Sequence, residues 1–313
     1  MPFTSEVHVD SALSSFASAY QNGDLFADIV CPVVEVDKRS GKFFKRSRAD
    51  VSSLRDDLMG PDSEANRSTY AVTTDSYSVQ DRGLKDVVSN ETIDNADEPL
   101  APLMDATDNL MMRLMLKRER RAATLLLTSG NYASGNTSAV ANAWSNAALG
   151  TPLADIHTAL SAVAPGDPGA TRTVMIMALE TWFALSRHPD MLGGGATSAV
   201  LTKDAAAALL GVDQICVSNA TYNTANEGQT ASYSRVWTAG SVAIVRVPRS
   251  APRGFTSLFA GTFRFKPSGG QAVTVRRWEE PALGPRGSQA VQVSFSDDES
   301  VIQNDMGYLL TGC

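Results

Sequence analysis

The feature that most constrains the fold is the stretch of residues 97–128, which is predicted to form one long helix. Asp97 and Glu98 stand where a helix N-terminus favours acidic side chains, and Pro99 and Pro102 fall in its first turn, where a missing N–H costs little. Mainly apolar residues recur at helical spacing and predict one buried stripe: Leu103, Thr107, Leu110, Met111, Leu114 and Leu125. At a rise of about 1.5 Å per residue, roughly 29 helical residues within this stretch would span roughly 43 Å, far more than an ordinary globular helix. We therefore expect it to be a structural spine.

The composition indicates a globular protein that is made in a reducing compartment. A chain of 313 residues, of which 43% are hydrophobic, can bury the core of one large domain or of two. It contains no run of about 18 apolar residues, so no transmembrane helix is predicted. The N-terminal MPFTSEVHVD lacks a basic region followed by an apolar core, so we expect no secretory signal. The 3 cysteines lie far apart, which argues against a disulfide framework.

Charge is distributed unevenly along the chain. The net charge is −7, and the acidic excess lies in the first hundred residues, so charge alone predicts a poor nucleic-acid binder. One basic segment stands out: Lys38, Arg39, Lys42, Lys45, Arg46 and Arg48. An acidic segment follows it directly: Asp50, Asp56, Asp57, Asp62 and Glu64. The two segments are natural candidates for contacts between charged surfaces.

The first third of the chain is predicted to depend on partners for its stability. Residues 1–30 contain too little apolar surface to fold alone, so we expect an arm that packs on another part of the assembly. Residues 33–45 predict a hairpin that turns at Arg39–Gly41, and residues 68–79 predict a further polar β-rich run. This region is too polar to form its own core, which favours a protruding hairpin that contacts another chain. Residues 84–93 are predicted to form a short helix.

The remainder predicts a mixed α/β region followed by antiparallel strands. Helices are expected at residues 152–163, 180–186 and 203–210, the last capped by Thr202 and ended by Gly211. Buried strands are expected at residues 173–178, 214–218 and 241–247, and residues 219–234 are expected to be a long polar loop. Alternating patterns predict antiparallel strands at residues 262–266, 272–278 and 289–295.

No pattern of residues predicts catalysis, a cofactor site or a metal site. His8, His157 and His188 do not stand at metal-ligand spacing with one another or with a cysteine. Cys31 precedes a proline in an apolar run and is expected to be buried and inert. The acidic groups at residues 279–280 and 297–299 are expected to be solvated turns. The basic residues of the spine, Arg113 and Lys117 to Arg121, are expected to form a solvated face, with contact to a phosphate backbone as the alternative.

The order of these parts resembles that of the major capsid proteins of tailed bacteriophages, which share the Hong Kong 97-type fold. The resemblance also lies in four strings, at residues 26–44 (FADIVCPVVEVDKRSGKFF), 81–100 (DRGLKDVVSNETIDNADEPL), 178–191 (ALETWFALSRHPDM) and 201–217 (LTKDAAAALLGVDQICV). None of the strings is a catalytic signature, so the resemblance depends on their occurring together. It implies an α+β fold with an N-terminal arm, an extended β-hairpin loop, a long spine helix in a peripheral domain and a compact α/β axial domain.

The resemblance also implies how the chain is divided and what it does. The arm would be residues 1–31, the extended loop 32–82, the peripheral domain 83–149 with the spine at 97–128, the axial domain 150–245, and the strands that return to the peripheral domain 246–313. The protein would self-assemble into pentamers and hexamers of an icosahedral shell around double-stranded DNA, with weak non-specific DNA contacts. Its partners would be other copies of itself, portal and scaffolding proteins, and a decoration protein as an optional addition. It would be made in the bacterial host cytoplasm and reside in the virion capsid, without membrane contact.

The residues that we expect to make contacts between subunits come from the charged segments and the strand between them. They are Lys38, Arg39, Lys42, Phe43, Phe44, Lys45, Arg46, Asp56, Asp57 and Glu64. The hypothesis is that the basic segment of one subunit meets the acidic segment of another. Three alternatives remain: an encapsulin-type compartment shell with the same fold, a cytoplasmic enzyme that uses residues 219–234 as a lid, and a tail or decoration protein.

Overall fold

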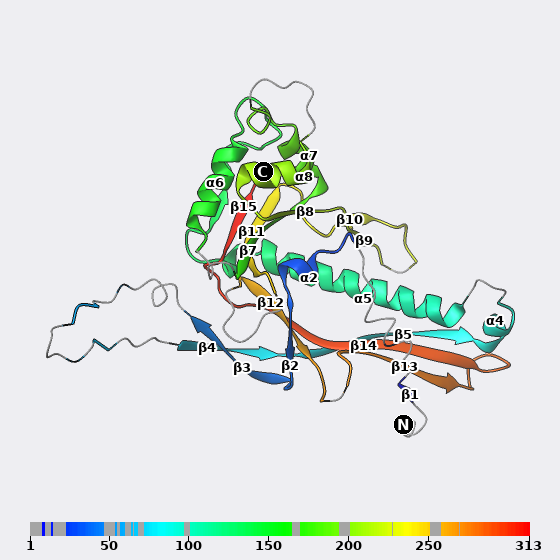
Figure 1. Ribbon diagram of the computed structural model, residues 1–313. Helices are drawn as coiled ribbons and strands as arrows, with labels where there is room; N and C mark the ends of the chain where they lie inside the picture. Colours follow the sequence, from blue (N-terminus) through cyan, green and yellow to red (C-terminus); the bar gives the residue numbers. More distant parts are fainter. Residues whose placement is uncertain are drawn as a thin grey trace.

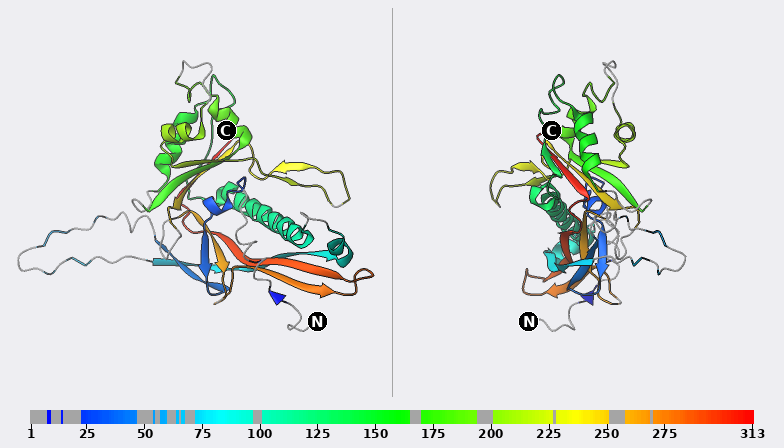
Figure 2. Two further views of the ribbon diagram at one scale, coloured as in Figure 1. Left: turned by 45° about the vertical axis from the view of Figure 1, so that its right-hand side comes forward. Right: turned by 90° about the vertical axis from the view of Figure 1, so that its left-hand side faces the viewer.

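The protein consists of a long helix that lies between an elongated sheet and a compact α/β unit (Figure 1). The computed structural model describes residues 8–9, 14, 23–46, 54, 57–59, 64, 66–67, 72–96, 101–164, 170–193, 201–226, 228–250, 258–268 and 270–313. Figure 2 shows, from two further sides, that two narrow hairpins leave this body in different directions.

The elongated layer is a six-stranded sheet whose strands come from both ends of the chain. Its order is β1 (His8–Val9), β13 (Val273–Glu280), β14 (Ser288–Val301), β12 (Ala260–Phe265) and β2 (Val33–Val36), and β5 (Gln80–Ser89) also pairs with β14. All of its pairings are antiparallel except that of β2 with β12. The three strands predicted near the C-terminus are therefore confirmed as β12, β13 and β14. The acidic residues 279–280 and 297–299 lie within β13 and β14, so the prediction that they form turns was wrong.

The spine is confirmed as helix α5 (Pro102–Leu127), which is 26 residues long. It begins at Pro102 because the proline ring suits the first helical turn, and the preceding Ala101 donates no side-chain cap. The expected capping residues 97–98 lie outside the described residues. Leu110, Met111 and Leu114 pack on the six-stranded sheet against residues such as Val275 and Val293, which fixes the helix along the sheet.

The compact unit is a five-stranded sheet with three helices. Its strand order is β6 (Thr137–Ala139), β15 (Gly307–Thr311), β11 (Ser241–Pro248), β7 (Thr171–Ala178) and β8 (Gln214–Ser218). Helices α6 (Pro152–Ala162), α7 (Leu179–Ser186) and α8 (Lys203–Leu210) confirm the three helices predicted here. The hydroxyl of Thr202 accepts a hydrogen bond from the amide of Ala205, and Gly211 ends α8 with a positive φ of 70°.

The last strand lies in a different sheet from the one that the sequence suggested. Residues 246–313 were expected to return to the sheet under the spine, yet β15 pairs with β11 and β6 in the five-stranded sheet. Pairing with the largely buried strand β11 allows Leu309 and Leu310 to be buried as well. The chain therefore crosses between the two sheets once more before its C-terminus.

Two hairpins project from the body (Figure 2). Strands β3 (Ser40–Arg46) and β4 (Val72–Ser78) pair antiparallel with each other and form a structure that we call the arm ribbon. The predicted hairpin between residues 33–36 and 42–45 was wrong, because β2 pairs with the distant strand β12 instead. The second hairpin is formed by β9 (Thr221–Asn223) and β10 (Tyr233–Arg235), where only a polar loop was predicted.

The short elements complete the chain, and one of them corrects a prediction. Residues 84–93 do not form one helix, because residues 84–89 belong to β5 and only α4 (Asn90–Asp94) is helical. Pairing with β14 along the whole of β5 outweighs the weak helical signal of this segment. Helix α2 (Ala27–Val30) contacts α5, and the 3-10 turn η1 (Ser129–Asn131) follows the end of α5.

Candidate functional site

The root of the arm ribbon is held on the six-stranded sheet by aromatic packing. The rings of Phe43 and Tyr77 lie 5.0 and 4.7 Å from the ring of Phe263 on β12. Gly41 lies directly opposite Tyr77 in the ladder, and a Cβ at this position would lie 2.8 Å from the tyrosine hydroxyl. The close approach explains why glycine is needed here. One face of the arm ribbon therefore packs on the six-stranded sheet of the same subunit.

Two of the basic residues predicted to contact another subunit also form ion pairs within the chain. Arg39 lies 2.7 Å from Asp81, and Lys45 lies 2.6 Å from Asp75. The hydrogen bond from Lys45 lowers the pKa of Asp75, and that from Arg39 lowers the pKa of Asp81. The partner of Arg39 lies on β5 and that of Lys45 on β4 of the same chain, and contact of these two residues with the acidic segment of a neighbour stays a prediction.

The other predicted contact residues are distributed over the root and the far end of the ribbon. Lys38 and Lys42 are exposed at the root, Phe44 is 54% exposed on the face opposite Phe43, and Arg46 ends β3. Asp57 and Glu64 are exposed beyond the ribbon. Asp56 lies outside the described residues. No contact with another subunit is tested by a single chain, so these residues remain predictions.

The sequence analysis missed large apolar side chains that lie among the acidic residues. Leu54, Leu58 and Met59 are 99%, 82% and 59% exposed. Three such exposed side chains within six residues are unusual for a surface segment. The signal was available as the pattern LRDDLM at residues 54–59, which we call the tip segment.

A buried network of charges joins α5 to the edge of the six-stranded sheet. Asp297 on β14 is fully buried and lies 2.8 Å from Arg82 on β5, 3.1 Å from Arg121 on α5 and 3.9 Å from Arg264 on β12. Arg121 also lies 2.7 Å from Glu299. Burial, together with the neighbouring Glu299, raises the pKa of Asp297 despite the surrounding arginines. Burial beside Arg118 lowers the pKa of the Arg264 guanidinium to about 10.

A second buried group fixes the N-terminal segment to the spine. The carboxylate of Glu119 accepts hydrogen bonds from the amides of Phe26 and Ala27, at 2.9 and 2.7 Å, and from the indole of Trp237, at 2.6 Å. Arg118 is buried next to it and lies 2.6 Å from Asp28. The prediction of a solvated basic face on the spine was therefore wrong for Arg118 and Arg121, and it holds for the exposed Arg113, Lys117 and Arg120.

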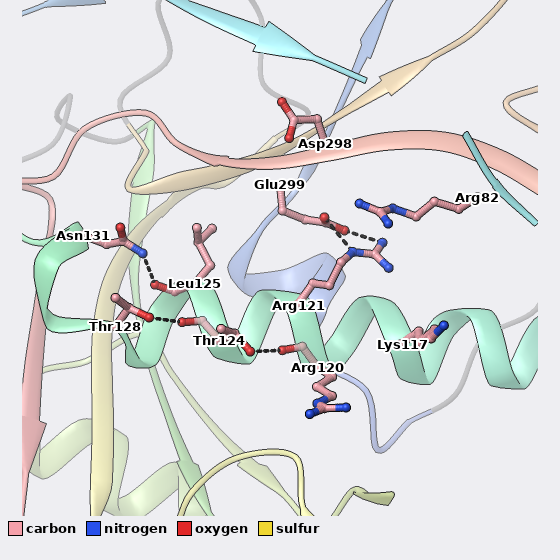
Figure 3. A pocket seen from close by; sticks show the side chains of 10 residues that line it. All are labelled: Arg82, Lys117, Arg120, Arg121, Thr124, Leu125, Thr128, Asn131, Asp298 and Glu299. Atoms are coloured by element: carbon pink, nitrogen blue, oxygen red, sulfur yellow. Dashed lines mark hydrogen bonds and ion pairs between the residues drawn. The ribbon is translucent and has the colours of Figure 1, made fainter. Parts of the chain in front are cut away.

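An open groove of about 600 Å³ runs between α5 and β14 beside this network (Figure 3). We call it the spine groove. It is lined by basic, acidic and small residues: Arg82, Lys117, Arg120, Arg121, Thr124, Leu125, Thr128, Asn131, Asp298 and Glu299. The hydroxyls of Thr124 and Thr128 donate to backbone carbonyls of their own helix, and the amide of Asn131 donates to the carbonyl of Leu125. These three side chains donate to the backbone of α5, so the polar groups that the spine groove offers to a ligand are mainly those of its charged side chains.

The residues of the described ranges that could bind a metal do not form a cluster, and two of the three cysteines are buried. No group of three or more His, Cys, Asp and Glu residues in the described part of the chain could hold a metal ion. Cys31 is buried as predicted, and burial raises the pKa of its thiol and raises that of Cys216 to about 12, so both thiols stay protonated at neutral pH. Within the described ranges no helix is long and apolar enough to cross a membrane. Residues 219–234, which the enzyme alternative assigns to a lid, carry β9 and part of β10.

Comparison with known proteins identifies the family to which this architecture belongs. No family model matches the chain. The major capsid protein of Pseudomonas phage JBD67 is 30% identical over 307 residues, which cover 96% of this chain and 95% of that protein. A crystal structure of a phage-related protein from Bordetella bronchiseptica RB50 covers 97% of both chains with a TM-score of 0.74 at 20% identity.

More distant structures share the fold alone. The capsid of cyanophage P-SCSP1u covers 94% of this chain and 90% of its own, with a TM-score of 0.59 at 11% identity. An encapsulin complex from Synechococcus elongatus PCC 7942 covers 97% of this chain and 95% of its own, with a TM-score of 0.54 at 13% identity. The expected α+β fold of the Hong Kong 97 type is confirmed. Because a relative of 30% identity spans nearly the whole of both chains, this chain belongs to the family of phage major capsid proteins.

Proposed function

We propose that this protein assembles into pentamers and hexamers that close an icosahedral phage head around double-stranded DNA. The observation that carries the proposal is the arm ribbon with its tip segment. A two-stranded ribbon has no core of its own, and its tip exposes Leu54, Leu58 and Met59 to solvent in the single chain. Such a segment gains stability only when a neighbouring subunit covers it. Many modest contacts of this kind favour a closed symmetric shell.

The proposed division of labour follows the parts of the fold. The N-terminal arm (residues 1–31) and the extended loop (32–82) would lie across neighbours, and the peripheral domain (83–149, with 246–313) would form the wall of the shell. The axial domain (150–245) would meet its copies at the centre of each pentamer or hexamer. Strand β15, which pairs with β11, would join this axial unit.

The chemistry of the shell suits a container for DNA. A net charge of −7 keeps the wall from binding phosphates strongly, so contacts with packaged DNA would be weak and non-specific. Portal and scaffolding proteins would complete the head, and a decoration protein is an optional addition. Synthesis and assembly would take place in the bacterial host cytoplasm, and the mature protein would reside in the virion.

Expression of the chain alone and with its genomic neighbours, followed by negative-stain electron microscopy, tests the proposal. Closed polyhedral shells, or rings of five and six subunits, are the expected result. Nuclease-resistant DNA in particles assembled during infection would support a phage head. Small shells that purify with a protein cargo would favour the encapsulin-type compartment that shares the fold. A monomer or dimer under all conditions would contradict assembly.

A further inference from the structure

A buried histidine lies in the axial unit, near the end that points away from the six-stranded sheet (Figure 1). His188 follows α7 and is only 3% exposed. Its Nδ1 accepts a hydrogen bond from the amide of Asp190 at 3.2 Å, so the ring proton lies on Nε2, which donates to the carbonyl of Asn146 at 3.4 Å. A Cβ added at Gly150 would lie 3.0 Å from Nε2. The loop of residues 143–150 therefore packs directly on a neutral imidazole.

The turn that contains His188 also holds the first turn of α6. The carboxylate of Asp190 accepts a hydrogen bond from the amide of Leu153 at 3.2 Å. Helix α6 begins at Pro152, and its N-cap residue Thr151 makes no side-chain cap hydrogen bond. Because the first amides of a helix have no partner within the helix, the carboxylate of Asp190 takes the place of the missing cap. His188 holds the backbone of this capping residue in position.

The charged groups on the elements around His188 have other partners. Their pairings are Asp155 with the indole of Trp144, Asp190 with the amide of Leu153, Glu180 with Arg235, and Arg187 with the ring of Phe183. The loop of residues 143–150 contains no ionisable side chain. Within the described ranges, no carboxylate forms an ion pair with the ring of His188. A positive charge on this ring would therefore be buried without a counter-charge.

Protonation of the ring would break the present hydrogen bonds. Histidine ordinarily changes its charge between about pH 5 and 8. A proton on Nδ1 would oppose the amide N–H of Asp190, so two donors would meet where a hydrogen bond now stands. The buried charge would add a cost of its own. If the carboxylate of Asp190 turned toward this charge, the amide of Leu153 would lose its acceptor. Either response loosens the first turn of α6.

We propose that His188 is a pH-sensitive latch, which holds the loop of residues 143–150 and the first turn of α6 at neutral pH and releases them in acid. The loop carries Leu149, whose side chain is 60% exposed on the surface of the axial unit. In the proposed shell this unit meets its copies, so acid would weaken the contacts at the centre of each pentamer and hexamer. This consequence rests on the proposed function, whereas the latch itself is a property of the single chain.

Hydrogen exchange of the unassembled full chain tests the latch without a shell. Exchange is followed by mass spectrometry at about pH 7.5 and about pH 5.5, on either side of the ordinary titration of histidine, and is corrected for the intrinsic exchange rate. We expect the protection of the first turn of α6 to fall about tenfold in acid, the effect of losing roughly one hydrogen bond. Protection of α8, which makes no hydrogen bond with His188, should change less than about twofold. An equal fall in both helices, or none in α6, would overturn the proposal.

Two variants separate the titration of His188 from other effects of acid. In His188→Asn the side-chain oxygen can accept from the amide of Asp190 in place of Nδ1 but does not titrate, so the fall should shrink to less than about twofold. His157→Asn is the matched control, because His157 is exposed on α6, and it should keep the fall of the wild type. A His188→Asn chain that shows the full fall would overturn the latch. If this variant does not fold, the comparison of α6 with α8 in the wild type still decides.

Failure of the latch and failure of the proposed function give different results. If the chains form no shells but show the acid-dependent exchange, the proposed function fails and the latch stands. If wild-type shells form and exchange of α6 does not depend on pH, only the latch fails. Where both hold, wild-type shells moved to about pH 5.5 should release subunits in sedimentation, and His188→Asn shells should retain them. Equal release from both shells would contradict the effect of the latch on assembly.

Discussion

Replacing Glu119 with alanine should destabilise the packing of the N-terminal segment and of the axial unit on the spine. The carboxylate is fully buried and is the acceptor for the amides of Phe26 and Ala27 and the indole of Trp237. Ala27 and Trp237 are themselves buried, so water cannot easily replace the lost acceptor. Each buried donor left without a partner costs about 1–3 kcal/mol. The void left by the side chain adds to this, so we expect a loss of about 3–6 kcal/mol.

The free energy of unfolding is measured on unassembled subunits by urea titration, with tryptophan fluorescence as the probe. A loss of this size is a large share of the 5–15 kcal/mol that is usual for a folded domain, so the midpoint should fall clearly. Amide hydrogen exchange at Ala27 should speed up in the same variant. Glu279→Ala is the matched control, since Glu279 is exposed on β13 and its removal should cost less than about 0.5 kcal/mol. An Ala variant at Glu119 within about 1 kcal/mol of the wild type would refute the reasoning.

Three further changes probe other parts of the structure. Burial raises the pKa of Glu119 above 4.5, so the folded protein binds a proton at this carboxyl more readily than the unfolded chain does. As the pH falls through the raised pKa toward 4.5, the free energy of unfolding of the wild type should therefore increase relative to that of Glu119→Gln. A decrease over this window in urea titrations would contradict the assignment. Asp297→Asn should cost about 3 kcal/mol because it removes the buried carboxylate that pairs with the partly buried Arg82 and Arg121, and a thermal melt unchanged from the wild type would count against the network. Gly211→Ala should cost about 1 kcal/mol, since φ is 70° and no atom lies within 4 Å of an added Cβ, so only backbone strain acts; an unaltered unfolding midpoint would show that this strain is absent.

Sequence patterns revealed the elements whose apolar spacing is local. Three examples are the spine, the cap of α8 at Thr202 and the buried strand β11. Each could be predicted from the residues of the element itself. These local patterns do not indicate which distant segments pair with each other. Strand β2 finds β12 more than two hundred residues later, so the apparent hairpin with β3 did not form. Strand β5 is similarly held by β14, which outweighs a weak helical pattern.

The burial of charged side chains could not be predicted from the sequence pattern either. Apolar periodicity marks the buried face of a helix only where that face is apolar, and α5 also buries Arg118 and Glu119 on it. The partners of these side chains come from α2 and the segment before β11, which no spacing along α5 could indicate. The acids at residues 297–299 resembled a solvated turn because their arginine partners lie on three other elements.

The central claim is that this chain builds the shell of a phage head from many copies of itself. Cryo-electron microscopy of particles assembled from the chain tests it most directly. We expect a closed icosahedral shell with subunits around its five-fold and six-fold positions and with the arm ribbon of each subunit lying across a neighbour. Particles in which the ribbon contacts no neighbour, or a chain that remains a monomer or dimer, would contradict it.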